Sequence, residues 1–323
     1  MLSLVIPVYK NAENLPRLFG ELDRLAEQLP DIEIVFVVDG SPDASLAILQ
    51  RHLTTWHVPS QLIELSRNFG SFPAIVAGLA SAKGDYMAVI AADLQEPPDL
   101  VVKFHALLTA GTTDVVLGHR TRRADPLLAR VTSDLFWGLY RRFVLKDIPK
   151  GGIDVFGCTR QVRDRLIELR EVTTNLVALL LWVGFRRTYV PYERRPRLEG
   201  RSAWTFFARL RYAADSIFAF TDLPIRALLV IGVAGVTLAL TAGLTVFVMW
   251  SLGRIPVLGY TPLMLVITFF GGSTALGLGI IGQYLWLSLQ NARGRPNFIV
   301  KTTVIYERKR GPQRRADVHA AGE

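Results

Sequence analysis

The stretch of sequence that decides the fold is Gly84-Asp85-Tyr86-Met87-Ala88-Val89-Ile90-Ala91-Ala92-Asp93-Leu94-Gln95-Glu96-Pro97-Pro98. The residues from Met87 to Ala91 are apolar without alternation, which is typical of a strand covered on both faces in a parallel sheet. Such a strand carries Asp93 and Gln95 to its carboxyl end, where open α/β sheets bind their ligands. The two prolines then end the strand and favour a helix that begins near Asp99.

The spacing of Asp93 and Gln95 points to a particular kind of ligand. An acid and an amide two residues apart at a rigid strand end suit a divalent ion that carries a phosphorylated ligand. An aspartate that only caps a turn is equally compatible with this stretch taken by itself. The rest of the sequence must therefore decide whether Asp93 is a metal ligand or only a turn cap.

Strands and helices alternate on both sides of this stretch. Further strands are predicted at 2–8, 32–38, 61–65 and 114–118, and helices over 15–29, through Leu46 and Leu49, and over 74–82. Asn11 is expected to cap the first of these helices. The alternation predicts a mostly parallel, layered α/β domain.

Each informative loop follows a strand, at Tyr9, Asp39, Arg67 and Asp93, so these loops should line one edge of the sheet. A nucleotide is the expected occupant of such an edge. No Gly-x-Gly-x-x-Gly follows the first strand and no Gly-Lys-Ser/Thr phosphate loop occurs in the sequence. Dinucleotide dehydrogenases and P-loop kinases are therefore disfavoured.

The composition predicts a membrane protein. Half of the 323 residues are hydrophobic and the mean hydropathy is +0.29, which is too apolar for an ordinary soluble enzyme. The net charge of +9 predicts an anionic partner, for which a bilayer surface, a nucleic acid and a phosphorylated substrate all qualify. A single cysteine, Cys158, allows no intrachain disulfide and indicates a reducing compartment. The first residues do not have the pattern of a signal peptide.

Two long uncharged stretches, 227–250 and 263–289, predict a transmembrane hairpin. The loop between them, 251–262, carries one cation, Arg254, whereas several cations flank the hairpin on its outer sides. The positive-inside rule then places both termini and the α/β domain in the cytoplasm, in a multi-pass protein of the inner membrane. The expected organisation is a catalytic domain at 1–200, interfacial amphipathic helices at 201–226, the spans, and a basic cytoplasmic tail at 290–323.

Two basic stretches lie between the predicted sheet and the hairpin. In the first, Arg130 and Ser133 lie on one face of a predicted helix and can grip a phosphate, although a solvated basic face is also compatible with the pattern. In the second, basic residues alternate with aromatic ones, which suits a helix in the bilayer interface at least as well as a nucleic-acid groove. The hairpin that follows favours the bilayer, so no nucleic acid is expected. The arginines of this second stretch are Arg186, Arg187, Arg194, Arg195, Arg197, Arg201, Arg209 and Arg211.

The chain resembles the polyprenyl-phosphate glycosyltransferases, which are family-2 glycosyltransferases of GT-A (Rossmann-like) fold akin to dolichol-phosphate mannose synthase and bactoprenol glucosyltransferase. The resemblance extends to about Val300. It rests on the terminal hairpin and on four motifs in order, Ser3-Leu4-Val5-Ile6-Pro7-Val8-Tyr9, Asp39-Gly40-Ser41-Pro42-Asp43, Ser66-Arg67-Asn68-Phe69-Gly70 and Ala92-Asp93-Leu94-Gln95-Glu96-Pro97-Pro98.

The resemblance implies an inverting hexosyltransferase of cell envelope polysaccharide synthesis. Such an enzyme moves a sugar from a UDP- or GDP-linked donor to polyprenyl (undecaprenyl) phosphate in the bilayer. The protein could act as a monomer or as a homo-oligomer. Mg²⁺ or Mn²⁺ would be held by Asp93 and Gln95, and catalysis would involve Asp93, Arg120 and Asp154. Asp154 either orients the acceptor or pairs with an arginine. The nucleotide would be held by Pro7, Val8, Tyr9, Asn11, Asp39 and Arg67, and the lipid phosphate by Arg120, Arg130, Ser133 and Arg201.

The sequence departs from the family pattern at several positions. The family usually has an acid where Ala91 stands, an acid or asparagine where Val38 stands, Asn-Glu at Lys10-Asn11, and a lysine at Ala203. Because position 91 lacks this carboxylate, a second hypothesis is that the protein is a catalytically silent homologue, which binds lipid phosphate or a partner protein as a scaffold. A processive polysaccharide synthase is disfavoured, because no Gln-x-x-Arg-Trp motif is present.

Overall fold

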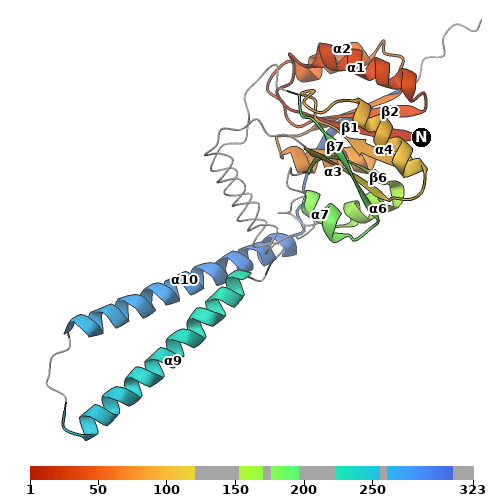
Figure 1. Cartoon of the computed structure of the whole chain (residues 1–323). Coiled ribbons are helices and arrows are strands. Elements are labelled where there is room, and N and C mark those ends of the chain that lie inside the picture. The colour runs from red at the N-terminus through yellow and green to blue at the C-terminus, as the bar shows by residue number, and fades with distance from the viewer. Residues whose placement is uncertain (121–152, 170–175, 196–220, 222, 255–259, 308–323) are drawn as a thin grey trace, which may run out of the picture.

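We describe the protein from a computed structural model, which describes residues 1–120, 153–169, 176–195, 221, 223–254 and 260–307. An α/β domain lies at one end and two long helices extend from it (Figure 1). The elements of the domain, in chain order, are β1 (Leu2–Val8), α1 (Leu15–Gln28), β2 (Ile32–Val38), α2 (Ser45–Leu53), β3 (Ser60–Leu65), α3 (Ser71–Ser81), β4 (Tyr86–Val89), α4 (Asp99–Thr109), β5 (Val115–Arg120), β6 (Ile153–Thr159), α6 (Arg160–Glu168), α7 (Leu176–Trp182), β7 (Arg187–Tyr192) and β8 (Val300–Tyr306).

The strands form one sheet in the order β7-β5-β6-β4-β1-β2-β3-β8. The neighbours β1–β2, β1–β4, β2–β3 and β5–β7 pair in parallel, whereas β6 and β8 run antiparallel to their neighbours. The expected mostly parallel α/β sheet is therefore confirmed. The four strands β1 to β4 point the same way, so the loops that follow them meet at one edge.

Helices cover both faces of the sheet (Figure 1). Successive residues of β1 belong to different hydrophobic clusters: Leu4 to the one that includes residues of α1, α2 and α4, and Val5 to the one that includes residues of α3, α6 and α7. Both side chains are fully buried. This two-sided burial explains why the strands read as continuous apolar runs in the sequence.

The structure corrects three local expectations. The central strand ends at Val89 instead of Ala91, although the Ile90 amide still donates to the Val5 carbonyl at 3.2 Å. Helix α3 begins at Ser71, three residues before the expected start. The side chain of Asn11 does not cap α1, because its Oδ1 accepts a hydrogen bond from the backbone amide of Tyr9 at 3.1 Å.

The C-terminal segment also differs from the expected tail. Residues Val300–Tyr306 form β8, which pairs antiparallel with β3 at the edge of the sheet. The Lys301 ammonium lies 2.6 Å from the Glu64 carboxylate of β3, and the amide of Ser66 donates to the carbonyl of Ile299 at 2.9 Å. Part of the region 290–323 is thus integral to the α/β domain. Residues 308–323 lie outside the described part.

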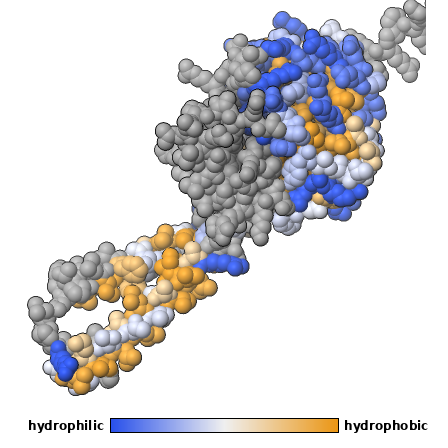
Figure 2. Space-filling model, in the orientation of Figure 1, coloured by the Kyte–Doolittle hydropathy of each residue, from blue (hydrophilic) through white to orange (hydrophobic). Residues whose placement is uncertain are grey.

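Helices α9 (Leu223–Ser251) and α10 (Tyr260–Ala292) project from the domain (Figure 1) and carry a largely hydrophobic surface (Figure 2). Their exposed apolar side chains include Leu240 at 69% and Leu285 at 68% exposure. Of the described residues, only Pro224–Ala242 is long and apolar enough to cross a membrane by length and composition. The second expected span, 263–289, lies within α10 and stays a prediction. Most of the expected interfacial segment, 201–226, is outside the described residues.

Candidate active site

The carboxylate of Asp39 joins the loop after β2 to the loop after β3. Its Oδ1 accepts a hydrogen bond from the amide of Phe69 at 2.7 Å, and its Oδ2 accepts one from the amide of Gly70 at 2.8 Å. The neighbouring Gly40 has a φ of +56°, and a Cβ there would clash with the backbone of Arg67 and Asn68. The two loops therefore touch backbone to backbone, with glycine at the point of contact.

Asp43 ties the loop after β1 to the same assembly. Its carboxylate accepts hydrogen bonds from the amide of Ala12 at 3.0 Å, the hydroxyl of Ser41 at 2.6 Å and the amide of Ser45 at 3.2 Å. The hydroxyl of Ser41 in turn accepts a hydrogen bond from the amide of Lys10 at 2.8 Å. The loops after β1, β2 and β3 thus form one hydrogen-bonded ledge at the carboxyl edge of the sheet.

The two aspartates of this ledge titrate differently. Burial raises the pKa of Asp39, and the hydrogen bonds from Phe69 and Gly70 only partly oppose that shift. At Asp43, burial also favours the neutral form, but the hydrogen bonds from Ser41, Ser45 and Ala12 outweigh it and lower the pKa. Asp43 is therefore held as a carboxylate that organises backbone donors.

Exposed aromatic and cationic side chains lie on the ledge. Tyr9 is 39% exposed, and the Lys10 ammonium lies 5.4 Å from the centre of its ring. The Arg67 guanidinium lies 4.0 Å from the centre of the Phe69 ring. A flat aromatic surface next to cations suits a base and its phosphates.

The loop after β4 carries the expected metal-binding pair. The amide of Gln95 donates to Oδ1 of Asp93 at 3.3 Å, and Leu94 between them has a φ of +57°. The side chain of Gln95 is buried, and its Oε1 accepts a hydrogen bond from Nη2 of Arg194. Nε of Arg194 lies 3.8 Å from Oε1 of the buried Glu96.

The donor set at this loop can be compared with the needs of a divalent ion. Among the residues that the structure describes, no group of three or more His, Cys, Asp or Glu side chains comes together as a metal site. One carboxylate, from Asp93, and one amide oxygen, from Gln95, are a small set. They fit an ion such as Mg²⁺, which is commonly bound by one or two carboxylates together with substrate phosphates.

Those of the other expected site residues that the structure describes lie at the same edge of the sheet. Arg120 ends β5, and Asp154 lies at the start of β6, which runs antiparallel to β4 with Phe156 opposite Val89. This register places the backbone of Asp154 beyond the carboxyl end of β4, at the edge of the sheet where Asp93 lies. Pro7 and Val8 end β1. Arg130, Ser133 and Arg201 lie outside the described residues.

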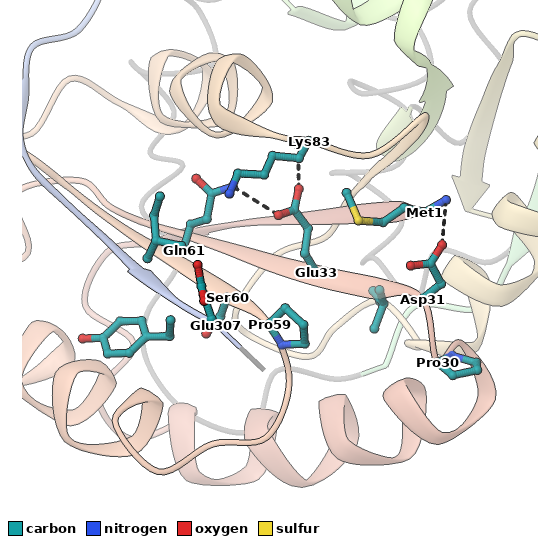
Figure 3. Close-up of a pocket in the computed structure, with 12 residues that line it drawn as sticks. Met1, Pro30, Asp31, Glu33, Pro59, Ser60, Gln61, Lys83 and Glu307 are labelled. Carbon is teal, nitrogen blue, oxygen red and sulfur yellow. Dashed lines mark hydrogen bonds and ion pairs between the residues drawn. The ribbon is translucent and has the colours of Figure 1, made fainter. Parts of the chain in front are cut away.

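A cavity of about 220 Å³ lies at the opposite edge of the sheet, near the amino ends of β1, β2 and β3 (Figure 3). Its carboxylate Glu33 accepts hydrogen bonds from the Ser3 hydroxyl at 2.5 Å, the Lys83 amide at 2.6 Å and the Gln61 side chain at 3.2 Å. Because these donors already satisfy Glu33, its role is to hold three segments of the domain together. None of the expected site residues that the structure describes lines this cavity.

Sequence reasoning missed two functional features of the edge. Asp43 was not singled out as the residue that joins loops, although its place in Asp39-Gly40-Ser41-Pro42-Asp43 was noted. Arg194 was counted only as part of a basic stretch, whereas the structure places it against Gln95 and Glu96. No local sequence signal reveals this contact, because 99 positions separate Arg194 from Gln95.

The fold and this edge define an α/β protein that gathers acidic, amide and basic side chains at the carboxyl ends of parallel strands, as proteins with phosphorylated ligands do. The chain belongs to glycosyl transferase family 2, whose profile matches residues 3–168. The matched region includes the strands from β1 to β6, and with them the whole ledge and the loop of Asp93.

Three similar proteins illustrate the comparison. An uncharacterized glycosyltransferase of Synechocystis sp. is 32% identical over 302 residues, which is 93% of this chain and 94% of that protein. A prophage-derived bactoprenol glucosyl transferase of Shigella flexneri is 30% identical over 93% of this chain and 97% of that protein. The solved structure of a mannosyltransferase of Pyrobaculum calidifontis has a TM-score of 0.45 at 15% identity, covering 88% of this chain and 87% of that chain, and is too distant to support an argument about ligands.

Proposed function

We propose that the protein is a membrane-bound inverting glycosyltransferase that moves a sugar from a nucleotide-sugar to polyprenyl phosphate. The proposal rests on one observation: the same chain carries the candidate active site, at the carboxyl edge of the sheet, and two long helices with exposed apolar surfaces (Figure 2). A family 2 enzyme built in this way needs an acceptor that reaches it from the bilayer. The bactoprenol glucosyl transferases that are about 30% identical over nearly their full length support the same acceptor class.

The helices α9 and α10 form the proposed membrane hairpin. Leucine side chains such as Leu229, Leu238 and Leu278, each at least 61% exposed, would face lipid rather than water. The short connection after α9 carries one cation, Arg254, whereas Arg293, Arg295 and Lys301 follow α10. The positive-inside rule then places the α/β domain in the cytoplasm of a multi-pass protein.

In the proposed mechanism, the ledge holds the nucleotide and Asp93 lies beside its diphosphate. Asp93 and Gln95 would hold Mg²⁺ or Mn²⁺, which neutralises negative charge on a leaving diphosphate when it is bound. Arg120, with Arg130, Ser133 and Arg201, would receive the lipid phosphate. That phosphate is already an anion at neutral pH, so it needs cations to approach the donor more than it needs a base.

The bonding change follows from the inversion. An oxygen of the polyprenyl phosphate attacks the anomeric carbon of the sugar, the bond from that carbon to the diphosphate breaks, and the nucleoside diphosphate leaves. Asp154 would lie near this centre and orient the acceptor. The charge lost by the acceptor oxygen appears on the leaving diphosphate, which is why stabilising the leaving group matters most.

A second candidate is a catalytically silent homologue that binds lipid phosphate or a partner protein as a scaffold. Ala91 favours it, because the resemblance implies an acid at position 91 and its absence leaves Asp93 as the one expected carboxylate ligand. The test incubates the purified protein with polyprenyl phosphate and a panel of labelled UDP- and GDP-sugars, with and without EDTA. Lipid-linked label that depends on the metal supports the enzyme, and no lipid-linked label with any donor supports the scaffold.

A further inference from the structure

Arg194 connects the loop after β7 to the loop after β4. Its Nη2 donates to Oε1 of Gln95, its Nε lies 3.8 Å from Oε1 of Glu96, and the amide of the next residue, Arg195, donates to the carbonyl oxygen of Gln95 at 2.9 Å. Three contacts therefore hold Gln95 and Glu96 from a segment nearly one hundred residues away. Arginine suits this place because its planar guanidinium presents donors in a fixed fork.

The burial of the acceptors shows that the contact is more than a surface ion pair. The side chain of Glu96 is only 2% exposed, and Gln95 is 9% exposed, whereas the side chain of Arg194 is 31% exposed. A buried carboxylate is costly without compensating charge and hydrogen bonds. Arg194 places a positive charge 3.8 Å from the Glu96 carboxylate and donates its hydrogen bond to the neighbouring Gln95.

The loop also needs support from outside its own sequence. Leu94 adopts a φ of +57°, a left-handed conformation that is uncommon for a residue other than glycine. Such a conformation persists only where the surroundings enforce it. Two sets of contacts hold the residues around Leu94: the hydrogen bond from the Gln95 amide to Asp93, which spans Leu94, and the contacts of Arg194 with Gln95 and Glu96, which follow it.

We propose that Arg194 is a positioning residue, which fixes the side-chain carbonyl of Gln95 in the loop that carries Asp93, for the metal that accompanies the donor diphosphate. The proposal rests on the function proposed above. An amide oxygen has two lone pairs, so the bond from Arg194 leaves one of them for an ion. With alanine at position 91, the loop has few charged ligands, so its affinity for an ion depends on how well the remaining oxygens are held.

The test measures metal-dependent nucleotide binding in the purified full-length protein. Labelled UDP and GDP are bound at equilibrium over a range of Mn²⁺ concentrations, and the Mn²⁺ concentration for half-maximal binding is compared among variants. Arg194→Met should raise that concentration by about tenfold or more, as loss of a partner that orients a metal ligand commonly does. Arg194→Lys should restore part of it. Arg195→Met is the matched control, because Arg195 is exposed and its contact to Gln95 uses the backbone.

A second variant separates positioning from a general structural effect. In a Gln95→Ala background, Arg194→Met should produce no further change in Mn²⁺ dependence, because the group on which Arg194 acts is gone. If Arg194→Met folds poorly because the buried Glu96 loses the positive charge beside it, the double variant Arg194→Met with Glu96→Gln removes the negative charge and should still show the weakened Mn²⁺ dependence.

The outcomes distinguish this proposal from the function on which it rests. If Arg194→Met shows the same Mn²⁺ dependence as the wild type, the role of Arg194 is overturned and the proposed function still stands. An Arg194→Met variant that loses binding equally with and without Mn²⁺ also overturns it, since that is a structural loss. If the wild type binds neither UDP nor GDP at any Mn²⁺ concentration, the proposed function fails and this proposal fails with it.

Discussion

Asp39 and Gly70 are joined by a hydrogen bond of 2.8 Å from the Gly70 amide to Oδ2 of Asp39, across 31 positions of the chain. The other carboxylate oxygen of Asp39 accepts from the amide of Phe69. Both oxygens are therefore used to align two loops of the candidate site. Any contact that Asp39 makes with a nucleotide comes in addition to this structural role.

Replacing Asp39 with asparagine should destabilise the domain and weaken nucleotide binding. Asn would keep one acceptor but turn its NH₂ group toward a backbone N–H donor, which leaves that donor without a partner. We expect a loss of about 2 kcal/mol in the free energy of unfolding. Urea denaturation of Asp39→Asn checks this against Glu13→Gln, a change at an exposed acid. Equal stability of the two variants would contradict the role given to Asp39.

Two glycines with left-handed backbones allow the loop contact itself to be tested. Gly40 has a φ of +56° and lies against the backbone of Arg67 and Asn68, whereas Gly111 has a φ of +70° and open space around it. Gly111→Ala should cost only the conformational strain, about 1 kcal/mol. Gly40→Ala should cost clearly more and should also weaken nucleotide binding, because the loops must separate. Similar losses in thermal unfolding and unchanged nucleotide affinity would show that the loop contact is unimportant.

The stability that Asp43 provides should depend on pH. Its pKa in the folded protein lies below the ordinary value of 3.8, so its carboxylate stabilises the fold above that pH and loses this effect as the pH falls through the lower, folded value. Asp43→Asn should therefore be less stable than the wild type at pH 7, by roughly 1–2 kcal/mol. The difference should shrink toward zero below pH 3.8. A difference that stays constant from pH 7 to pH 3 would contradict this assignment.

Cysteine labelling in intact cells should report the topology of the hairpin. The native Cys158 is fully buried, and burial raises its pKa to about 12, so it should give little background. A cysteine at Gly253, just after α9, should react with an impermeant reagent. A cysteine at Glu307, just after β8, should react only after the membrane is opened. The reverse pattern would place the α/β domain on the other side of the membrane.

The sheet was predictable from the sequence where its strands are buried on both faces. β1, β2 and β4 lie in the middle of the sheet, so continuous apolar runs mark them without reference to their partners. β8 was missed for the opposite reason. It is an edge strand whose residues are mostly exposed, and the one strand with which it pairs in the described part of the chain, β3, lies more than two hundred positions earlier.

The site was predictable as a position but not as a set of contacts. Strand direction alone brings the residues after β1 to β4 to one edge, which is why Tyr9, Asp39, Arg67 and Asp93 were correctly expected there. Asn11 failed as a helix cap because the chain turns at Lys10, where φ is +55°, and directs the Asn11 side chain to Tyr9. The contact of Arg194 with Gln95 depends on how β5, β6 and β7 join the sheet, which no short motif encodes.

The central claim is that Asp93 serves metal-dependent sugar transfer to polyprenyl phosphate. The most direct measurement is the rate of lipid-linked sugar formation by the wild type, with and without EDTA, and by Asp93→Asn, with Asp99→Asn as an exposed control in the same segment. The account predicts that EDTA stops the wild type, that Asp99→Asn keeps its rate, and that Asp93→Asn falls by roughly two to four orders of magnitude, as loss of a main electrostatic stabiliser does. Transfer by Asp93→Asn at the wild-type rate, or a wild type that is insensitive to EDTA, would contradict it.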